Sequence, residues 1–131
     1  MVGRRKGSTS LTPLELEIMQ VLWREGASNV MQVQTQLAPE KKLAYTTVQT
    51  MLNVLHRKGR VERVLNGRAY DYSAVESKET VHTQAVRDLV AKMFGGSSEE
   101  LVMSLVKRRE IDPARIAELS RIAMEEGERD E

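Results

Sequence analysis

The 131-residue sequence contains no cysteine, and this absence excludes several kinds of chemistry together. A chain without cysteine forms no disulfide, binds no zinc through thiolates and has no cysteine nucleophile, and it suits a reducing compartment. Nowhere do roughly 18 apolar residues, enough for a membrane-spanning helix, follow one another. No apolar segment follows the basic first residues, as an export signal would require. We therefore expect a folded cytoplasmic protein that neither spans a membrane nor is exported.

Aromatic residues are also scarce, at 4% of the chain, whereas hydrophobic residues make up 40%. The core is therefore expected to be modest and built mainly from Leu, Val, Ile and Met. Charge is unevenly distributed. Residues 1–75 hold 11 Lys and Arg against 6 Asp and Glu, a net +5, whereas residues 76–131 hold 9 against 13, a net −4. A basic half joined to an acidic half is typical of a polyanion-binding module with a separate interaction segment.

Residues suited to catalysis or metal binding are few. The chain has two histidines, His56 and His82, and no Gly-rich phosphate loop. Glu79 and His82 have a spacing that some helical metal sites use, but a single pair of this kind is far more typical of an exposed polar face. We therefore expect no enzyme, no metal site and no cofactor.

The first ordered element is expected after a disordered arm over residues 1–10, which is rich in Gly, Ser and basic residues. Thr12, Pro13 and Glu15 have the pattern of a helix start, with a threonine N-cap, proline at the first helical position and a glutamate that completes a capping box. Gly26 is expected to end this helix. Its apolar face repeats at helical spacing through Leu14, Ile18, Val21 and Leu22. The indole N–H of Trp23 is expected to reach a polar partner.

Two further helices and a hairpin are predicted next. Ser28 or Asn29 can cap a short helix that stops near Pro39. A third helix begins at Tyr45 or Thr46 and ends at Gly59, with Val48, Met51, Leu52 and Leu55 facing inward. Residues 61–65 and 68–72 then favour strands, and Asn66-Gly67 between them predicts a type I′ turn in which both central residues have positive φ.

The remainder of the chain, residues 76–131, is expected to be helical. Gly95-Gly96 separates a first helix from a second that Ser97 and Glu100 open with a capping box, and Asp112-Pro113 caps a third. Three amphipathic helices in roughly fifty residues form too small a core to be stable alone. A second copy of the chain is the economical partner. The expected dimer interface comprises Val81, Ala85, Leu89, Met93, Leu101, Leu105, Ile116, Leu119 and Ile122.

Three helices followed by a ribbon are the elements of a winged helix-turn-helix. The predicted fold is therefore mostly α with a small β-ribbon: a winged-helix DNA-binding domain over residues 11–75 and a helical dimerisation region over residues 76–131. The second of the paired helices would enter the major groove of DNA. Its residues that the core does not require are Thr46, Thr47, Gln49, Thr50 and Asn53, and we expect these to contact bases.

These residue types suit base recognition. Gln and Asn can pair bidentately with adenine, and Thr offers a hydroxyl and a methyl group. Each β-branched residue lowers helix stability by a few tenths of a kcal/mol relative to alanine, whereas a good base contact contributes about 1–3 kcal/mol of discrimination. Alternatively, Thr46 caps the helix and the other polar residues are simply solvated.

Cations bracket the same helix and favour the DNA-binding alternative. They would neutralise phosphates and set the register of the protein on the duplex. The expected phosphate contacts are Lys41, Lys42, Arg57, Lys58 and Arg68, and Arg60 and Arg63 belong to the same group of flanking charges.

Four segments in order carry a family resemblance: LTPLELEIMQVLW, AYTTVQTMLNVLHRKG, NGRAYDY and FGGSSEELV. Over residues 11–125 the chain resembles the penicillinase-repressor (BlaI/MecI) family of bacterial transcriptional repressors. The resemblance implies an N-terminal winged helix, C-terminal dimerisation and repression through a palindromic operator. By motif position it places Thr46, Thr47, Gln49 and Thr50 at the DNA.

The chain also departs from the family pattern. Val54 stands where family members often have arginine in the recognition helix. The bond that is cut during induction of β-lactam-responsive members matches Ser104-Leu105 here, so proteolytic release is not expected. The cysteine-rich metal motif of copper-responsive relatives is missing, and the inducing signal stays open.

The expected partners are therefore an operator in double-stranded DNA and a second copy of the chain. The alternative is a winged-helix protein-interaction module that does not bind DNA. Salt dependence distinguishes the two, because binding to phosphates weakens steeply as salt rises.

Overall fold

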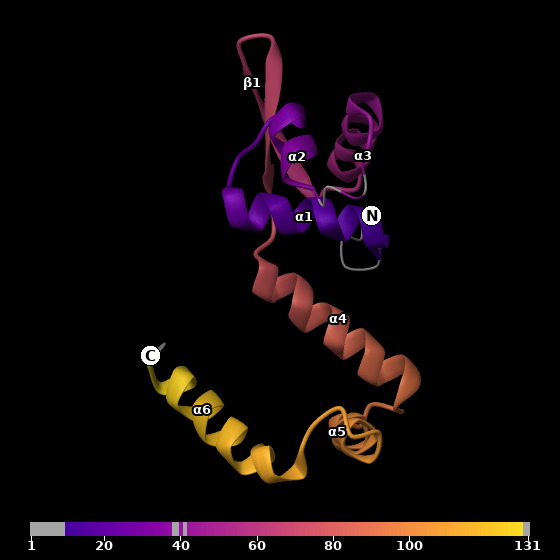
Figure 1. Ribbon diagram of the computed structural model, residues 1–131, viewed down its shortest axis with the longest axis vertical. Coiled ribbons are helices and arrows are strands. Elements are labelled where there is room, and N and C mark those ends of the chain that lie inside the picture. The colour runs from indigo at the N-terminus through magenta and orange to yellow at the C-terminus, as the bar shows by residue number, and fades with distance from the viewer. Residues whose placement is uncertain (1–9, 38–39, 41, 130–131) are drawn as a thin grey trace, which may run out of the picture. The chain divides into compact units, whose positions relative to one another are not determined.

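A computed structural model describes residues 10–37, 40 and 42–129 of the chain. In the part of the chain that the structure describes, the named elements follow in this order (Figure 1): α1 (Pro13–Glu25), α2 (Val30–Gln36), α3 (Tyr45–Arg57), β1 (Val61–Asn66), β2 (Ala69–Ala74), α4 (Lys78–Met93), α5 (Ser98–Lys107), the 3₁₀ helix η3 (Pro113–Arg115) and α6 (Ile116–Arg129). This mostly helical chain with one two-stranded antiparallel sheet confirms the predicted fold class. Apart from Ser10, the arm predicted over residues 1–10 lies outside the described residues.

Helix α1 has both predicted ends. The Thr12 hydroxyl accepts a hydrogen bond from the Glu15 N–H at 3.2 Å, and Glu15 Oε1 accepts one from the Thr12 N–H at 2.9 Å, which completes the capping box. At the other end Gly26 has φ +82° and its N–H donates to the Leu22 carbonyl. Glycine adopts this left-handed conformation without the steric penalty of a side chain. The helix therefore begins and ends where local chemistry dictates.

The start of α2 uses one of the two predicted caps. Asn29 and Gln32 exchange hydrogen bonds between side chain and backbone N–H, each at 2.8 Å. Ser28 instead pairs with Tyr72 through two backbone hydrogen bonds of 2.9 and 2.8 Å. The turn between α1 and α2 is thereby attached to strand β2.

Helix α3 begins at Tyr45, one of the two predicted positions, and Ala44 is its N-cap residue. Alanine has no side-chain acceptor, and no side-chain hydrogen bond caps this helix. Thr46 therefore lies inside the helix, and the alternative in which it acts as the cap is wrong.

The β-hairpin corrects the predicted turn. Asn66 pairs with Ala69, so it belongs to β1, and the two loop residues are Gly67 and Arg68. Gly67 has φ +69°, whereas neither Asn66 nor Arg68 has positive φ. Positive φ at the first loop residue alone is the pattern of a type II′ turn, which favours glycine there. The predicted type I′ turn at Asn66-Gly67 is therefore wrong by one residue.

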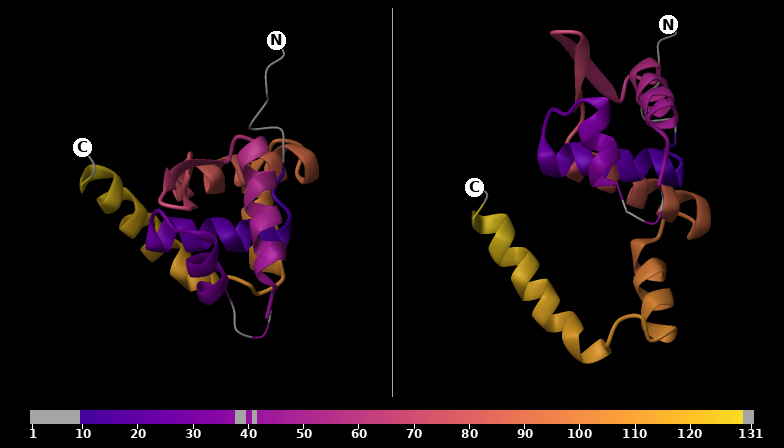
Figure 2. Two further views of the ribbon diagram at one scale, coloured as in Figure 1. Left: turned by 90° about the horizontal axis from the view of Figure 1, so that it is seen from above. Right: turned by 45° about the horizontal axis from the view of Figure 1, so that its top comes forward.

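The core joins the first three helices to the hairpin. Its fully buried side chains are Ile18, Met19, Val33, Val48, Leu52 and Leu55. Helix α3 and the hairpin project from the same side of α1, as Figure 1 and the right-hand view of Figure 2 both show. Burial of one face of α3 in this core leaves its opposite face free for contacts outside the domain.

By packing, the chain divides into residues 1–84 and residues 85–131. The first unit includes the beginning of α4, later than the boundary expected after residue 75. Trp23 Nε1 donates to the Glu76 carbonyl at 2.9 Å, which confirms the expected polar partner of this indole. The Trp23 and His82 rings pack edge to face, with their centroids 6.1 Å apart. These contacts attach the first turns of α4 to the winged-helix unit.

The second unit has little core of its own. Among its side chains that the structure describes, only Val90 is buried. Ser97 caps α5 by accepting a hydrogen bond from the Glu100 N–H at 3.1 Å. The Ser97 N–H donates to the Phe94 carbonyl at 2.9 Å, so the reciprocal half of the predicted capping box does not form. Asp112 caps η3 rather than α6 directly. No described helix is long and apolar enough to cross a membrane.

Candidate DNA-binding interface

The first turns of α3 present an uncharged polar surface. Thr46, Thr47, Gln49 and Thr50 are all exposed, whereas Val48 and Leu52 on the opposite side of the helix are completely buried. Helical periodicity separates the two groups because residues three and four apart share a face. The structure therefore brings together four of the five predicted base-contacting residues.

The fifth predicted residue, Asn53, faces the hairpin. Its Oδ1 accepts hydrogen bonds from Arg63 Nη1 at 3.1 Å and from the Tyr72 hydroxyl at 3.0 Å. A guanidinium has no acceptor, so the oxygen rather than the nitrogen of the amide must face Arg63. Asn53 is half-buried and is engaged inside the domain.

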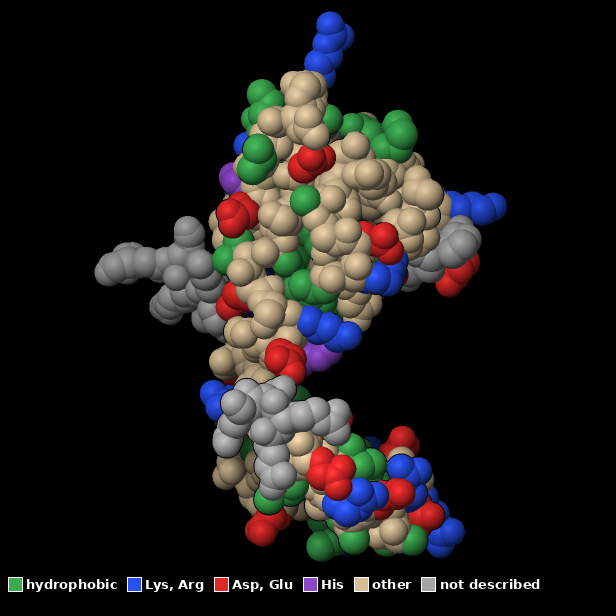
Figure 3. Space-filling view, turned by 90° about the vertical axis from the view of Figure 1, so that its left-hand side faces the viewer, with side chains coloured by type: hydrophobic (Ala, Val, Ile, Leu, Met, Phe, Trp, Pro, Cys, Tyr) green, Lys and Arg blue, Asp and Glu red, His purple; other side chains and the backbone are tan. Residues whose placement is uncertain are grey.

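Three of the predicted phosphate-binding cations are exposed. Lys42 precedes α3, Arg57 ends it, and Arg68 occupies the turn of the hairpin. Figure 3 shows a Lys or Arg side chain at the hairpin tip. Lys42 lies before the first residue of α3 and Arg57 is its last residue, and this 13-residue helix is roughly 20 Å long at 1.5 Å per residue. Lys41, which is also a predicted phosphate contact, lies outside the described residues.

Lys58 is held by an acidic partner. Its Nζ lies 2.8 and 2.9 Å from the two carboxylate oxygens of Glu15, and the side chains of Lys58 and Glu15 are 24% and 4% exposed. Burial raises the pKa of Glu15, but the hydrogen bonds from Lys58 and Thr12, together with the Lys58 charge, outweigh burial and leave that pKa below its ordinary value. The charge of Lys58 is therefore largely compensated within the domain.

Arg60 does not face outward as the sequence suggested. It is 7% exposed and its Nη1 lies 2.9 Å from Glu76 Oε1. The backbone strengthens this connection because the Val75 N–H donates to the Arg60 carbonyl at 2.9 Å. Arg60 therefore joins the end of α3 to the segment before α4, and the expectation that it contacts phosphate is wrong because the guanidinium is buried.

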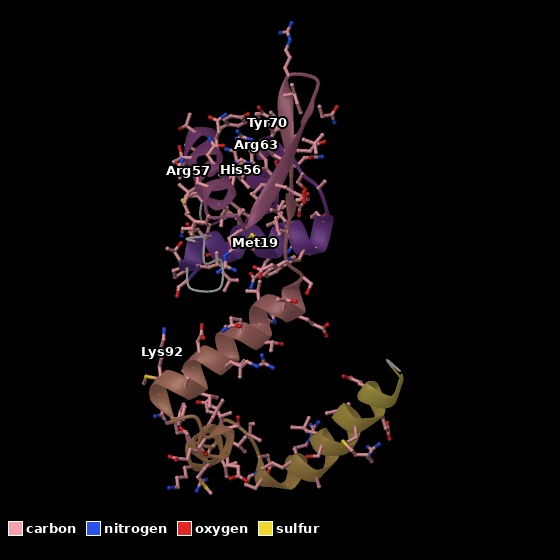
Figure 4. The ribbon with its side chains drawn as sticks, turned by 180° about the vertical axis from the view of Figure 1, so that it is seen from behind. Met19, His56, Arg57, Arg63, Tyr70 and Lys92 are labelled. Carbon is pink, nitrogen blue, oxygen red and sulfur yellow. The ribbon has the colours of Figure 1, made fainter. Side chains whose placement is uncertain are left out.

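Arg63 reveals contacts that sequence reasoning missed. Its guanidinium lies 4.3 Å from the centroid of the Tyr70 ring, within cation–π distance. Figure 4 labels Arg63 and Tyr70 on the hairpin and His56 and Arg57 on α3. The strand register places Arg63 opposite Tyr72, and alternation along the two strands could have indicated that all three side chains share one face.

An exposed polar helix that packs on the two helices before it, together with a cation-tipped hairpin, defines a winged helix-turn-helix domain. The family model described as Penicillinase repressor matches residues 11–125. The chain belongs to this penicillinase repressor family, whose members are DNA-binding transcriptional repressors and not enzymes.

Two bacterial regulators of similar sequence agree with this assignment. The transcriptional regulator BlaI of Mycobacterium tuberculosis is 32% identical over 108 residues, covering 81% of this chain and 78% of the relative. The penicillinase repressor of Staphylococcus aureus is 21% identical over 105 residues, covering 80% and 83%. Among solved structures, the DNA-binding domain of the repressor BlaI is 29% identical, with a TM-score of 0.48 over 53% of this chain and 84% of that domain.

Proposed function

We propose that two copies of this chain bind a palindromic operator in double-stranded DNA and thereby block transcription. The observation that carries the proposal is the exposed, uncharged polar face of α3 with cations at its margins. A repressor of this family acts on bacterial DNA, so the proposed function also places the protein in the cytoplasm.

The proposed base contacts come from α3. Gln49 can donate to and accept from adenine through its amide, and Thr46, Thr47 and Thr50 supply hydroxyl and methyl groups at the same face. All four are exposed on the N-terminal turns, the part of a recognition helix that reaches base edges in helix-turn-helix proteins. The family model covers this whole segment, which supports the same assignment.

The proposed phosphate contacts are Lys42, Arg57 and Arg68, with Lys41 next to them in the sequence. The first three are exposed at the two ends of α3 and at the hairpin turn, where they would meet separate parts of the DNA backbone. Such contacts fix the register of a protein on the duplex without reading sequence. Lys58 contributes less than predicted because Glu15 compensates its charge.

The proposed dimer uses the C-terminal helices. Leu89, Met93, Leu119 and Ile122 are 43%, 70%, 42% and 37% exposed, although each is apolar. An apolar groove along α5 and η3–α6 adds to this surface, lined by Val102, Met103, Val106 and Ile116. The apolar side chains that one copy leaves exposed would be buried by a second copy, and a twofold axis requires a palindromic operator.

Selection of bound duplexes from a random pool tests the function. We expect a palindrome whose half-sites lie roughly one helical turn apart. Gln49→Ala should relax the base preference, whereas Lys42→Ala should weaken all duplexes alike. Recovery of no preferred duplex, even at low salt, would contradict the proposal and favour a protein-interaction module instead.

A further inference from the structure

We infer that Asn53 positions the hairpin against α3 instead of reading a base, and that it thereby sets where Arg68 meets the DNA. The contacts that do so, here called the wing latch, are formed by the side chains of Asn53, Arg63, Tyr70 and Tyr72. The inference rests on the DNA-binding function proposed above and concerns the geometry of that same interface.

The oxygen of Asn53 is fully used inside the protein. A side-chain amide oxygen has two lone pairs, and here one receives Arg63 Nη1 and the other the Tyr72 hydroxyl. Bidentate recognition of adenine needs this oxygen to accept from the base while the amide nitrogen donates. Asn53 can therefore offer DNA only its Nδ2 hydrogens, and these alone cannot form the bidentate contact with adenine, which also needs an acceptor.

The latch connects α3 to the part of the hairpin that projects beyond the core. Tyr72 is 2% exposed and belongs to the core, whereas Leu65 nearer the turn is 61% exposed. Arg63 lies opposite Tyr72 and is bonded to Asn53 on α3, and its guanidinium lies over the ring of Tyr70, which pairs with Leu65 nearer the turn. A two-stranded ribbon is marginally stable alone, so these contacts determine its direction.

The position of Arg68 depends on that direction. Arg68 is in the hairpin turn, and no described backbone pairing attaches the turn to α3. The latch is the side-chain connection between the projecting hairpin and the helix proposed to enter the major groove. Loss of the latch should therefore displace Arg68 relative to Gln49 while leaving Gln49 in place on α3.

A double-mutant cycle on the intact protein tests this coupling. Asn53→Ala removes both hydrogen bonds of the latch and Tyr72→Phe removes one, and each variant should weaken operator binding by about three- to tenfold. The double variant should bind no more weakly than the weaker single variant, since both changes open the same latch. Asn66→Ala is the matched control. Its Nδ2 donates a hydrogen bond to Asp71 Oδ2 within the hairpin at 2.9 Å, and loss of this exposed contact should leave operator affinity within about twofold of the wild-type value.

Salt dependence separates positioning from simple stabilisation. Asn53→Ala should reduce the slope of log K against log salt by about 0.9, the value for one phosphate contact. Arg68→Ala should have no further effect in that background. A role confined to stability would lower the melting temperature and leave the slope unchanged, which would overturn the inference.

Base preference provides the second decisive readout. Selection with Asn53→Ala should return the wild-type consensus, whereas Gln49→Ala should lose preference at particular base pairs. Loss of preference at one position in Asn53→Ala, or additive effects in the cycle, would show that Asn53 reads a base and would overturn the inference while the proposed function stands. Failure of the wild-type protein to retain any duplex would instead remove the proposed function, and this inference with it.

Discussion

At the residue scale, Glu15 combines two structural roles in one buried carboxylate. It completes the capping box of α1 and holds Lys58 at the end of α3, so it joins two helices of the core. We expect Glu15→Gln to lower the free energy of unfolding by about 1–2 kcal/mol at neutral pH, because glutamine keeps the cap but loses the ion pair. Urea unfolding of the two proteins measures the difference.

The pH dependence of this difference follows from the pKa of Glu15. Because the pKa is lowered in the folded state, the stabilisation is fully present above the ordinary pKa of glutamate and is lost as pH falls through the folded-state pKa. The two proteins should therefore converge in stability in acid. Glu25→Gln is the control, since its ion pair with Arg24 is exposed and should contribute almost nothing. A stability difference that is constant with pH would contradict this account.

At the element scale, the hairpin turn depends on one glycine. Gly67 has φ +69°, and a Cβ there would meet no atom within 4 Å, so the penalty for a side chain is conformational rather than steric contact with neighbours. We expect Gly67→Ala to lower the free energy of unfolding by about 1 kcal/mol. Thermal unfolding followed by circular dichroism measures this change.

Asparagine at the same position is the matched variant. Asparagine adopts positive φ more readily than alanine, so Gly67→Asn should be less destabilising than Gly67→Ala. Equal losses in the two variants would show that the backbone conformation at Gly67 is not what limits stability.

The hairpin also shows why its face was predictable and its register was not. A loop at Asn66-Gly67 would have placed Arg63 opposite Tyr70, whereas the observed loop places it opposite Tyr72. A partner that moves by two residues stays on the same face of the sheet, because side chains alternate with a period of two. Apolar and polar alternation therefore could not distinguish the two turns.

At the scale of the whole molecule, the apolar surface of residues 85–131 is the reason to expect a second copy. Leu89 is 43% exposed in the single chain, so Leu89→Asp should leave the fold intact but place an unpaired carboxylate in the proposed interface. Sedimentation equilibrium should then show separated chains. Operator affinity should fall by at least about a hundredfold, since linked half-site contacts act at high effective concentration.

Ala91→Asp is the control for this change. Ala91 is also exposed, but a separation of two residues places it on the opposite side of α4 from Leu89. The Ala91→Asp substitution introduces the same charge in the same helix and should leave the assembly unchanged. An unaltered dimer in Leu89→Asp, or dissociation by both variants, would contradict the proposed interface.

Local chemistry made the helix ends and the exposed face of α3 predictable. Capping at Thr12 and Asn29, the glycine at 26 and the helical period of α3 all depend on residues within a few positions of one another. The exposed face of Thr46, Thr47, Gln49 and Thr50 follows from the same period, because burial of Val48 and Leu52 fixes which side is outward.

The sequence by itself determined the helices, the existence of the hairpin and the face that α3 exposes, since each is set by short-range periodicity and capping. Only the tertiary structure decided how polar side chains from distant elements are paired. Asn53 with Arg63 and Tyr72, Lys58 with Glu15, and Arg60 with Glu76 are such pairs. Their distances depend on how the elements pack, and an exposed cation and an internally paired one have the same letter in the sequence.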